Sequence, residues 1–301
     1  MSLLPIKRVW IVGAGGLLGS VLRERCVRCR AVYEAEHGGL GMVRRSFERG
    51  VAARCTLAFD PLCRGGGIAS CVQEPGAIAR AVELAGEPEL VYFCAATRGG
   101  DAAAYRRAYL EPVQAVAAAA PSARLVFCSS AAVYEGQGDA AEDAPTPGST
   151  EKLRILLEAE QAVREAGGVV ARLAPLYGGG RCELLRRHLA GEPQLPGAPE
   201  RTLNYLHVEA AADALFLLGY APQLRHSVYN VCDETFTKAQ AYAMLEALTG
   251  IPASRESASA GRRGISDHRV VAERIREVYA PQPHFASYVQ SCLRGDGAGD
   301  L

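Results

Sequence analysis

The chain has 301 residues, enough for one large domain or two closely joined ones around a sizeable core. Lys plus Arg and Asp plus Glu each total 33, so the formal net charge is zero. This balance predicts neither a nucleic-acid surface nor a polyanionic tail, and it favours small molecules or proteins as partners. No apolar run approaches the roughly 18 to 20 residues of a membrane span. The start of the chain also differs from a signal peptide, so we expect a cytosolic protein that does not bind membranes.

A glycine-rich turn follows the first predicted strand, the apolar run from Val9 to Val12. Gly13, Gly16 and Gly19 form a GxxGxxG pattern where a helix is predicted to begin. The first glycine permits a tight turn, the second lets the backbone approach a pyrophosphate, and the third lets helix and strand pack closely. The helix N-terminus adds free N–H groups and the positive end of its dipole. The pattern therefore predicts a site for a dinucleotide, NAD or NADP.

The position of the second strand decides which acidic residue would bind the adenosine ribose. A strand over Arg30 to Glu34 would make Glu34 or Glu36 the ribose ligand, whereas a strand over Arg54 to Phe59 would give that role to Asp60. Either register ends in an acid, which slightly favours NAD. The arginine pair at positions 44 and 45 could instead meet a 2′-phosphate, so NADP stays open.

Apolar runs alternate with helical patterns through the first two thirds of the chain. Strands are predicted over Leu90–Ala95, Leu125–Cys128 and Val169–Leu173, and helices over Gly76–Leu84, Ala102–Ala120 and Glu151–Ala166. This alternation is typical of a parallel sheet covered by helices on both faces. With the glycine loop at its start, the pattern predicts an α/β protein with a Rossmann-type, doubly wound parallel sheet.

The composition changes after Leu173, where Gly and Pro gather at positions 178–180 and 193–199. Helices are predicted over Val208–Leu218 and Lys238–Leu248, with a strand over Val228–Val231 between them. We interpret this region as a smaller C-terminal substrate lobe. The predicted domains are a dinucleotide-binding domain over 1–175 and a substrate-binding lobe over 176–301, partly interleaved with the first.

Ten cysteines are spread along the chain, several of them in apolar segments that look like buried strands. In a reducing compartment such residues behave as small buried hydrophobes. Cys26 and Cys29 form a CxxC pair, but a zinc site needs a second pair of ligands at similar spacing. We therefore expect no metal site.

Six segments, in the expected order, resemble the extended short-chain dehydrogenases/reductases, the NAD-dependent epimerase/dehydratase-like group. They read GAGGLLG, YRRAYLEPVQAV, LVFCSSAAVYEG, ARLAPLYGGGR, RTLNYLHVEAAADALFLL and HSVYNVCDETFTKAQAYAMLEALTG. The resemblance covers almost the whole chain. Beside the three glycines, it implies that the cofactor is bound at Leu17, Leu18, Ala95, Ala96, Ser129 and Pro175. Arg98 follows the carboxyl end of a predicted parallel strand, where ligands bind in such sheets, and could bind the cofactor phosphate or a substrate carboxylate.

The resemblance also implies a catalytic serine, Ser130, whose hydroxyl would hydrogen-bond a substrate oxygen. In that family the acid/base is a tyrosine four residues before a lysine, and the lysine lowers the tyrosine's pKa. No Tyr-x-x-x-Lys occurs in this sequence. If the chain is aligned on Glu160, Lys152 stands at the family's tyrosine position and Leu156 at its lysine position. If Lys152 is instead aligned with the family's lysine, Gly148 stands at the tyrosine position. The chain thus resembles atypical members that lack the pair.

Several side chains are candidates for the missing chemistry. Lys152 could donate a proton if it is buried, or lie exposed in the first turn of its helix. Tyr109, where the family often has asparagine, could supply the phenol from a neighbouring helix. Tyr134 could face the substrate or pack on the second lobe, and Ser130 could simply cap the loop that follows it. We interpret His207 as a structural histidine rather than a base.

The first functional hypothesis is an NAD(P)-dependent oxidoreductase or epimerase/dehydratase-like enzyme. It would move hydride between nicotinamide and a carbinol carbon of a small polar substrate. The alternatives are a non-catalytic dinucleotide-binding sensor or scaffold, and a redox-neutral lyase or cyclase on the same fold. The resemblance further implies a homodimer that pairs through a four-helix contact, made by Ala102–Ala120 and Glu151–Ala166 of each copy.

Overall fold

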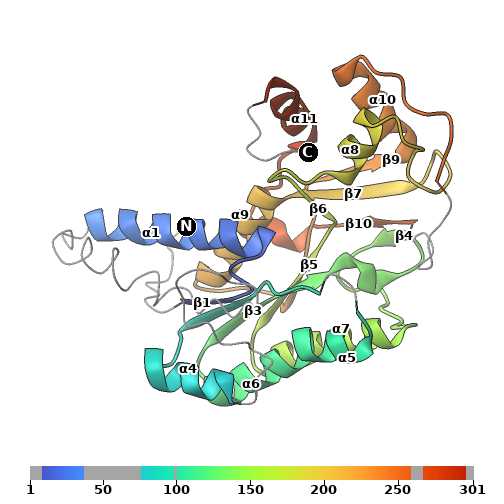
Figure 1. Ribbon diagram of the computed structural model, residues 1–301. Helices are drawn as coiled ribbons and strands as arrows, with labels where there is room; N and C mark the ends of the chain where they lie inside the picture. The colour runs from blue at the N-terminus through green and yellow to red at the C-terminus, as the bar shows by residue number, and fades with distance from the viewer. Residues whose placement is uncertain (1–8, 37–75, 98–99, 259–266, 296–301) are drawn as a thin grey trace. The chain divides into compact units, whose positions relative to one another are not determined.

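The computed structural model describes residues 9–36, 76–97, 100–258 and 267–295 (Figure 1). The chain divides into two compact units that alternate along the sequence. The first unit comprises Met1–Ser129, Gly148–Arg172 and Ala212–Tyr229. The second comprises Ser130–Pro147, Leu173–Ala211 and Asn230–Leu301. The division into a cofactor domain over 1–175 and a lobe over 176–301 stays a prediction.

The central sheet has five strands in the order β1-β2-β3-β5-β8. They are β1 (Val9–Val12), β2 (Leu90–Phe93), β3 (Arg124–Ser130), β5 (Val169–Leu173) and β8 (Val228–Val231). The pairings β1–β2 and β2–β3 are parallel and in continuous register. Every residue of β1, β2, β5 and β8 is buried, because a parallel sheet is covered on both faces.

Helices cover the sheet of the first unit on both faces (Figure 1). On one face lie α1 (Leu17–Glu36) and α9 (Val208–Tyr220), and on the other α4 (Ala77–Ala85), α6 (Glu111–Ala119) and α7 (Glu151–Glu165). An ion pair of 2.5 Å between Arg25 Nε and Asp213 Oδ1 joins α1 to α9. The Tyr92 hydroxyl of β2 donates to the backbone carbonyl of Phe216 in α9 at 3.3 Å.

The helix predicted over Ala102–Ala120 is present, but a π-helical turn interrupts it. The segment consists of α5 (Ala102–Tyr105), the π-helical η2 (Arg106–Leu110) and α6. Pro112, near the start of α6, has no N–H to donate, and its ring would clash with the carbonyl four residues earlier in a regular helix. A widened turn just before the proline relieves that clash, and such turns are frequent at functional sites.

The second unit has two small sheets. In one, β7 (Thr202–His207) lies between β6 (Leu176–Tyr177) and β9 (Glu234–Thr237); in the other, β4 (Gln137–Ala140) pairs with β10 (Asp267–Val270). Helices α8 (Glu183–Leu189), α10 (Lys238–Thr249) and α11 (Phe285–Arg294) complete the unit, with the short 3-10 helices η3 (Ala131–Tyr134) and η4 (Arg274–Glu277). The core of this unit includes Tyr177, Leu185, Tyr242, Leu245 and Phe285.

One of the two predicted positions for the second strand is wrong. Helix α1 continues through Glu36, so Arg30 to Glu34 are helical, and Glu34 does not end a strand. The cause is local: from Leu17 to Glu36 the chain has no proline and one glycine, Gly19, among many residues that favour helix. The alternative strand over Arg54–Phe59, with Asp60 and the arginine pair at 44 and 45, lies outside the described residues.

Candidate dinucleotide site and catalytic residues

The glycine loop between β1 and α1 is packed so tightly that two of its glycines have no room for a side chain. Gly13 has φ +88°, and a Cβ built on it would lie 2.6 Å from the backbone nitrogen of Ala95. A Cβ on Gly19 would lie 2.2 Å from the Gly13 carbonyl oxygen. The close approach of helix, turn and strand thus depends on these glycines, which is the role that a dinucleotide fingerprint gives them.

Gly16 has a different environment from Gly13 and Gly19. Its N–H donates to the Gly13 carbonyl at 3.0 Å, and a Cβ there would meet only that same oxygen, at 3.3 Å. Helix α1 begins at the next residue, Leu17, and has no acidic side chain in its first turn. No carboxylate in this turn therefore neutralises the partial positive charge of the helix N-terminus and its free N–H groups. The loop is thus electrostatically suited to bind a pyrophosphate.

Four other positions predicted to bind cofactor lie in the same unit and close to this loop. Leu18 is buried and Leu17 half-buried at the start of α1. Ala95, whose nitrogen faces Gly13, is half-buried, and Ala96 is exposed. Four of the predicted positions are thus gathered where β1 and β2 end, at the carboxyl edge where ligands of parallel sheets bind.

Ser129, also predicted to bind cofactor, has its side chain engaged in a buried ionic network. Its hydroxyl donates to Glu160 Oε1 at 2.5 Å. Arg172 of β5 donates to the same carboxylate through Nη2 at 2.7 Å and through Nε at 3.1 and 3.2 Å. The Arg172 and Glu160 side chains are only 6% and 2% exposed. The network joins β3, α7 and β5 and fixes the end of β3.

The segment after Ser129 forms a tight turn in the second unit. The Ser130 hydroxyl accepts a hydrogen bond from the Ala132 N–H at 3.2 Å and so caps the 3-10 helix η3. This is the structural role considered for Ser130 above, and it leaves the hydroxyl hydrogen free to point elsewhere. Glu135 ends the turn at φ 46° and ψ 156°. Such strained, glycine-like conformations concentrate at functional sites.

Tyr134 is buried rather than open to a ligand. It is 3% exposed, and its hydroxyl donates to Asn230 Oδ1 at 2.5 Å. Asn230 in turn donates from Nδ2 to the Ala140 carbonyl at 2.9 Å and to the Val271 carbonyl at 2.8 Å. Tyr134 therefore belongs to a polar network that holds β8, β4 and the segment after β10 together.

Tyr109 and Lys152 are both in the first unit and are connected through Tyr105. The Tyr109 hydroxyl accepts from the Thr97 N–H at 3.2 Å, and its ring lies 5.2 Å from that of Tyr105. Lys152 Nζ lies 5.5 Å from the centre of the Tyr105 ring, a cation–π contact. A chain of contacts therefore runs from the glycine loop through the segment after β2 to Tyr109 and then to Lys152, in the first turn of α7.

The electrostatics of Tyr109 differ from those of the family's tyrosine. Burial raises the pKa of Tyr109, and the hydrogen bond from the Thr97 N–H offsets this only in part. Tyr109 is therefore a neutral phenol near pH 7 and can donate a proton but not accept one. Leu156, at the lysine position when the chain is aligned on Glu160, is 5% exposed and apolar, so it cannot lower a phenol's pKa.

His207 and Asp233 lie together in the second unit. His207 Nδ1 accepts from the Glu209 N–H at 3.3 Å, and the His207 N–H donates to Asp233 Oδ2 at 3.0 Å. Burial lowers the pKa of His207 to about 4 and raises that of Asp233 to about 7. His207 is thus neutral and hydrogen-bonded at pH 7, as a structural histidine would be. Asp233 was not among the predicted site residues; the available signal was a pair of acids, Asp233 and Glu234, shortly after an apolar strand.

Arg98 and Asp60 lie outside the described residues. Pro175 is exposed in the second unit, and its carbonyl accepts from the Leu206 N–H at 3.1 Å. Ser130 and Tyr134 belong to the second unit, whereas the glycine loop, Tyr109 and Lys152 belong to the first.

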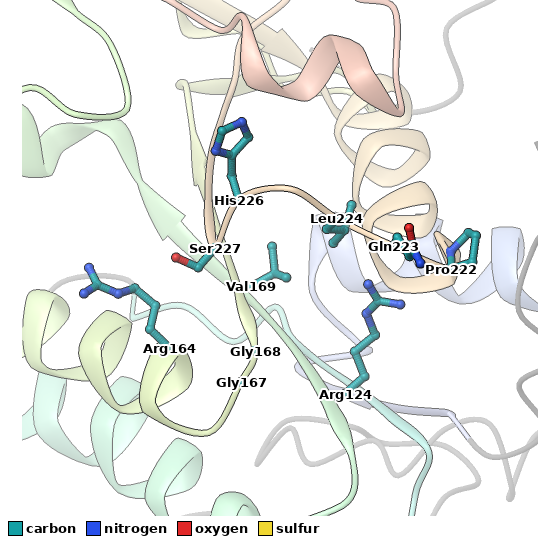
Figure 2. A pocket seen from close by; sticks show the side chains of 10 residues that line it. All are labelled: Arg124, Arg164, Gly167, Gly168, Val169, Pro222, Gln223, Leu224, His226 and Ser227. Carbon is teal, nitrogen blue, oxygen red and sulfur yellow. The ribbon is translucent and has the colours of Figure 1, made fainter.

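A pocket of about 390 Å³ in the first unit lies elsewhere (Figure 2). The turn between α7 and β5 and the loop before β8 line it, with Arg124, Arg164 and His226 as the basic side chains. These segments precede the strands, so the pocket is at the amino edge of the sheet, opposite the glycine loop. It contains none of the predicted site residues.

Among the residues that the structure describes, no group of three or more His, Cys, Asp or Glu side chains could hold a metal ion. Within the same ranges, no helix has both the length and the apolar character needed to cross a membrane.

Comparisons with known proteins give similarity in structure but not in sequence. No protein-family model matches the chain, and no curated protein does. MoeE5, solved with UDP-glucuronic acid and NAD, has a TM-score of 0.72 at 20% identity, over 96% of this chain and 100% of that one. A UDP-glucose 4-epimerase from Thermotoga maritima, solved with UDP-glucose, has a TM-score of 0.71 at 16% identity, over 96% and 99%.

A dTDP-glucose 4,6-dehydratase from Bacillus anthracis, solved with NAD, has a TM-score of 0.69 at 13% identity, over 96% of each chain. At these identities the similarity concerns the fold. The chain has the Rossmann-type fold of nucleotide-sugar epimerases and dehydratases. The predicted fold class is therefore confirmed, as is the resemblance to extended short-chain dehydrogenases/reductases at the level of the fold.

Proposed function

We propose that this chain is an atypical extended short-chain dehydrogenase/reductase, an NAD(P)-dependent oxidoreductase or epimerase/dehydratase-like enzyme. The observation that carries the proposal is the glycine loop, where Gly13 and Gly19 leave no room for a Cβ against Ala95 and against the loop's own backbone. Solved structures of the same fold contain NAD, which supports NAD as the cofactor, with NADP as the alternative. A bound dinucleotide would supply the hydride acceptor and donor.

The same structural neighbours support a proposal for the substrate class. MoeE5 and the Thermotoga maritima epimerase are solved with UDP-sugars, so we propose a nucleotide sugar or a similar small polar molecule with a carbinol carbon. The loop N–H groups and the start of α1 would bind the pyrophosphate of the dinucleotide. We also propose that the second unit binds the substrate and that two copies pair through the helices around α5–α6 and α7.

The proton chemistry needs a route other than a tyrosine–lysine pair. Ser130 would orient the substrate oxygen with its free hydroxyl hydrogen. Tyr109, a neutral phenol, suits the donation of a proton, while Lys152 or a water molecule would have to accept one.

The test combines cofactor and substrate. The purified protein is incubated with NAD or NADP and, separately, with UDP-glucose, UDP-glucuronic acid or dTDP-glucose. Products are separated by chromatography, and nicotinamide reduction is followed by absorbance. The proposal expects conversion of at least one sugar, impaired in Lys152→Met and Tyr109→Phe but not in Gln161→Met, a matched change at an exposed position of α7. Conversion that does not depend on added or bound nicotinamide would refute the proposed chemistry.

A second candidate is a dinucleotide-binding protein without catalysis. The observation that favours it is the apolar Leu156, buried at the position where the family has lysine. Lys152, a candidate catalytic group, also makes a cation–π contact with Tyr105, which gives it a structural role that does not require catalysis. Binding of NAD without conversion of any sugar in the panel would support this candidate over the enzyme.

A further inference from the structure

Two cysteine thiols meet at the carboxyl edge of the central sheet. Cys94 follows the last residue of β2, and Cys128 lies in β3. Their sulfur atoms are 3.5 Å apart, and both residues are half-buried and carry free thiols. None of the functional roles proposed above uses either thiol.

The strand register explains why the two sulfurs meet. The β2–β3 pairing is parallel and aligns Phe93 with Phe127, so Cys94 and Cys128 are the next partners in line. Neighbouring strands lie about 4.8 Å apart. That separation is within the range of about 4.4–6.8 Å between Cα atoms that a disulfide requires. Because a disulfide S–S bond is about 2.0 Å long, the sulfurs must approach by roughly 1.5 Å, which side-chain rotation can provide.

We propose that Cys94 and Cys128 are a modification site, where a peroxide converts the two thiols into a reversible intramolecular disulfide. In the first step a thiolate attacks the peroxide: an S–O bond forms, the O–O bond breaks, and the hydroxide that leaves takes up a proton to become water. In the second step the other thiol attacks the sulfenic sulfur. The S–S bond forms, the S–O bond breaks, and a second water leaves. Two thiols are oxidised and one peroxide is reduced.

The surroundings of the pair set the rate of this reaction. The hydrogen bond between the two thiols and burial both raise the pKa of Cys94, so its thiolate is scarce at neutral pH. The attacking species is the thiolate, so oxidation becomes faster as the pH rises. Accessibility is partial because both residues are half-buried, which favours a small oxidant.

The position of the pair gives the modification a structural consequence. A Cβ on Gly13 would lie 2.8 Å from the carbonyl carbon of Cys94, so the backbone of Cys94 packs directly against the glycine loop. The Cys94 N–H also donates to the Val12 carbonyl at 2.8 Å. A disulfide would therefore tie β3 to the backbone that supports the loop.

The experiment treats the full-length protein with hydrogen peroxide at several pH values, followed by alkylation and peptide mapping by mass spectrometry. The expected result is one cross-linked pair of peptides containing Cys94 and Cys128, with loss of two hydrogens, formed faster at higher pH and reversed by dithiothreitol. Cys94→Ser and Cys128→Ser should each abolish it, whereas Cys292→Ser, a change at another half-buried cysteine, should not.

Three results would overturn the proposal. One is alkylation of both residues as free thiols after treatment that oxidises other cysteines of the same chain. Another is cross-linking of either residue to a different cysteine. The third is a cross-link between Cys94 and Cys128 of two different copies, detected as a covalent dimer. Circular dichroism of the serine variants verifies that each is folded before its thiols are mapped.

Discussion

Removal of one charge from the buried Glu160–Arg172 pair should destabilise the protein strongly. In Glu160→Gln the shape of the side chain is kept, but Arg172, 6% exposed, loses the negative charge of Glu160. Breaking a buried ion pair on one side costs about 3–5 kcal/mol, since an uncompensated charge stays buried. Ser129→Ala removes one of several hydrogen bonds to the same carboxylate. The Ser129→Ala variant should lose stability near the low end of about 1.5–3 kcal/mol, the usual range for a hydrogen bond to a charged group.

The double variant Glu160→Leu with Arg172→Met separates the charge effect from packing. Replacing both partners by apolar residues of similar size is often close to neutral. The double variant should therefore be more stable than either of its single variants, Glu160→Leu or Arg172→Met, which gives a large favourable coupling energy in the double-mutant cycle. Urea unfolding at constant m-value measures each difference. A loss below about 1 kcal/mol for Glu160→Gln, or a double variant as unstable as the sum of its singles, would refute the reasoning.

The remaining predictions concern three titratable residues and Ser130, the proposed catalytic serine. The pKa of Asp233 is raised to about 7, so the stability that this group contributes falls as the pH rises from about 4 to 7. In urea unfolding, the free energy of unfolding of Asp233→Asn should therefore increase relative to that of wild type as the pH rises through this window. The pKa of His207 is lowered to about 4, so the stability that this group contributes is lost as the pH falls from about 6.5 to 4. The free energy of unfolding of His207→Gln should therefore increase relative to that of wild type as the pH falls. A difference in unfolding free energy that does not change with pH would contradict the lowered pKa. Absorbance titration of wild type minus Tyr109→Phe should show phenolate forming only above the ordinary tyrosine pKa; ionisation near neutral pH would show that the environment of Tyr109 is misread. Ser130→Ala should reduce turnover by roughly 10²–10⁴-fold, while loss of its cap lowers stability by only about 0.5–2 kcal/mol; unchanged turnover would remove Ser130 from the mechanism.

The sequence predicted those parts of the fold that depend on local pattern. The strands from Val9 and Val228 have the predicted bounds, and the helix from Glu151 ends within a residue of its prediction. Each combines a short apolar run or an amphipathic pattern with clear end signals. The glycine loop was predictable for the same reason, because three glycines at fixed spacing after a strand have few other structural uses.

The parts that the sequence did not predict depend on contacts between distant residues. Strands β4 and β10 have no alternating apolar pattern; side chains of Asn230 and Asn204 bind the backbone around them. The acceptor for the Tyr134 hydroxyl lies 96 residues away in the sequence. The Glu160–Arg172 pair did leave a signal, since an arginine inside the apolar strand VVARL requires a buried partner.

The central claim is that the glycine loop binds a dinucleotide, and calorimetric titration with NAD(H) and NADP(H) tests it most directly. A suitable variant is Gly16→Arg, because Gly16 contacts little in the folded chain and a long side chain there would occupy the space before α1. The matched control is Ala166→Arg, which adds the same charge at an exposed position after α7. The account predicts micromolar binding of one cofactor by wild type and control, and its loss in Gly16→Arg. Failure of wild type to bind either cofactor, or equal binding by Gly16→Arg, would contradict it.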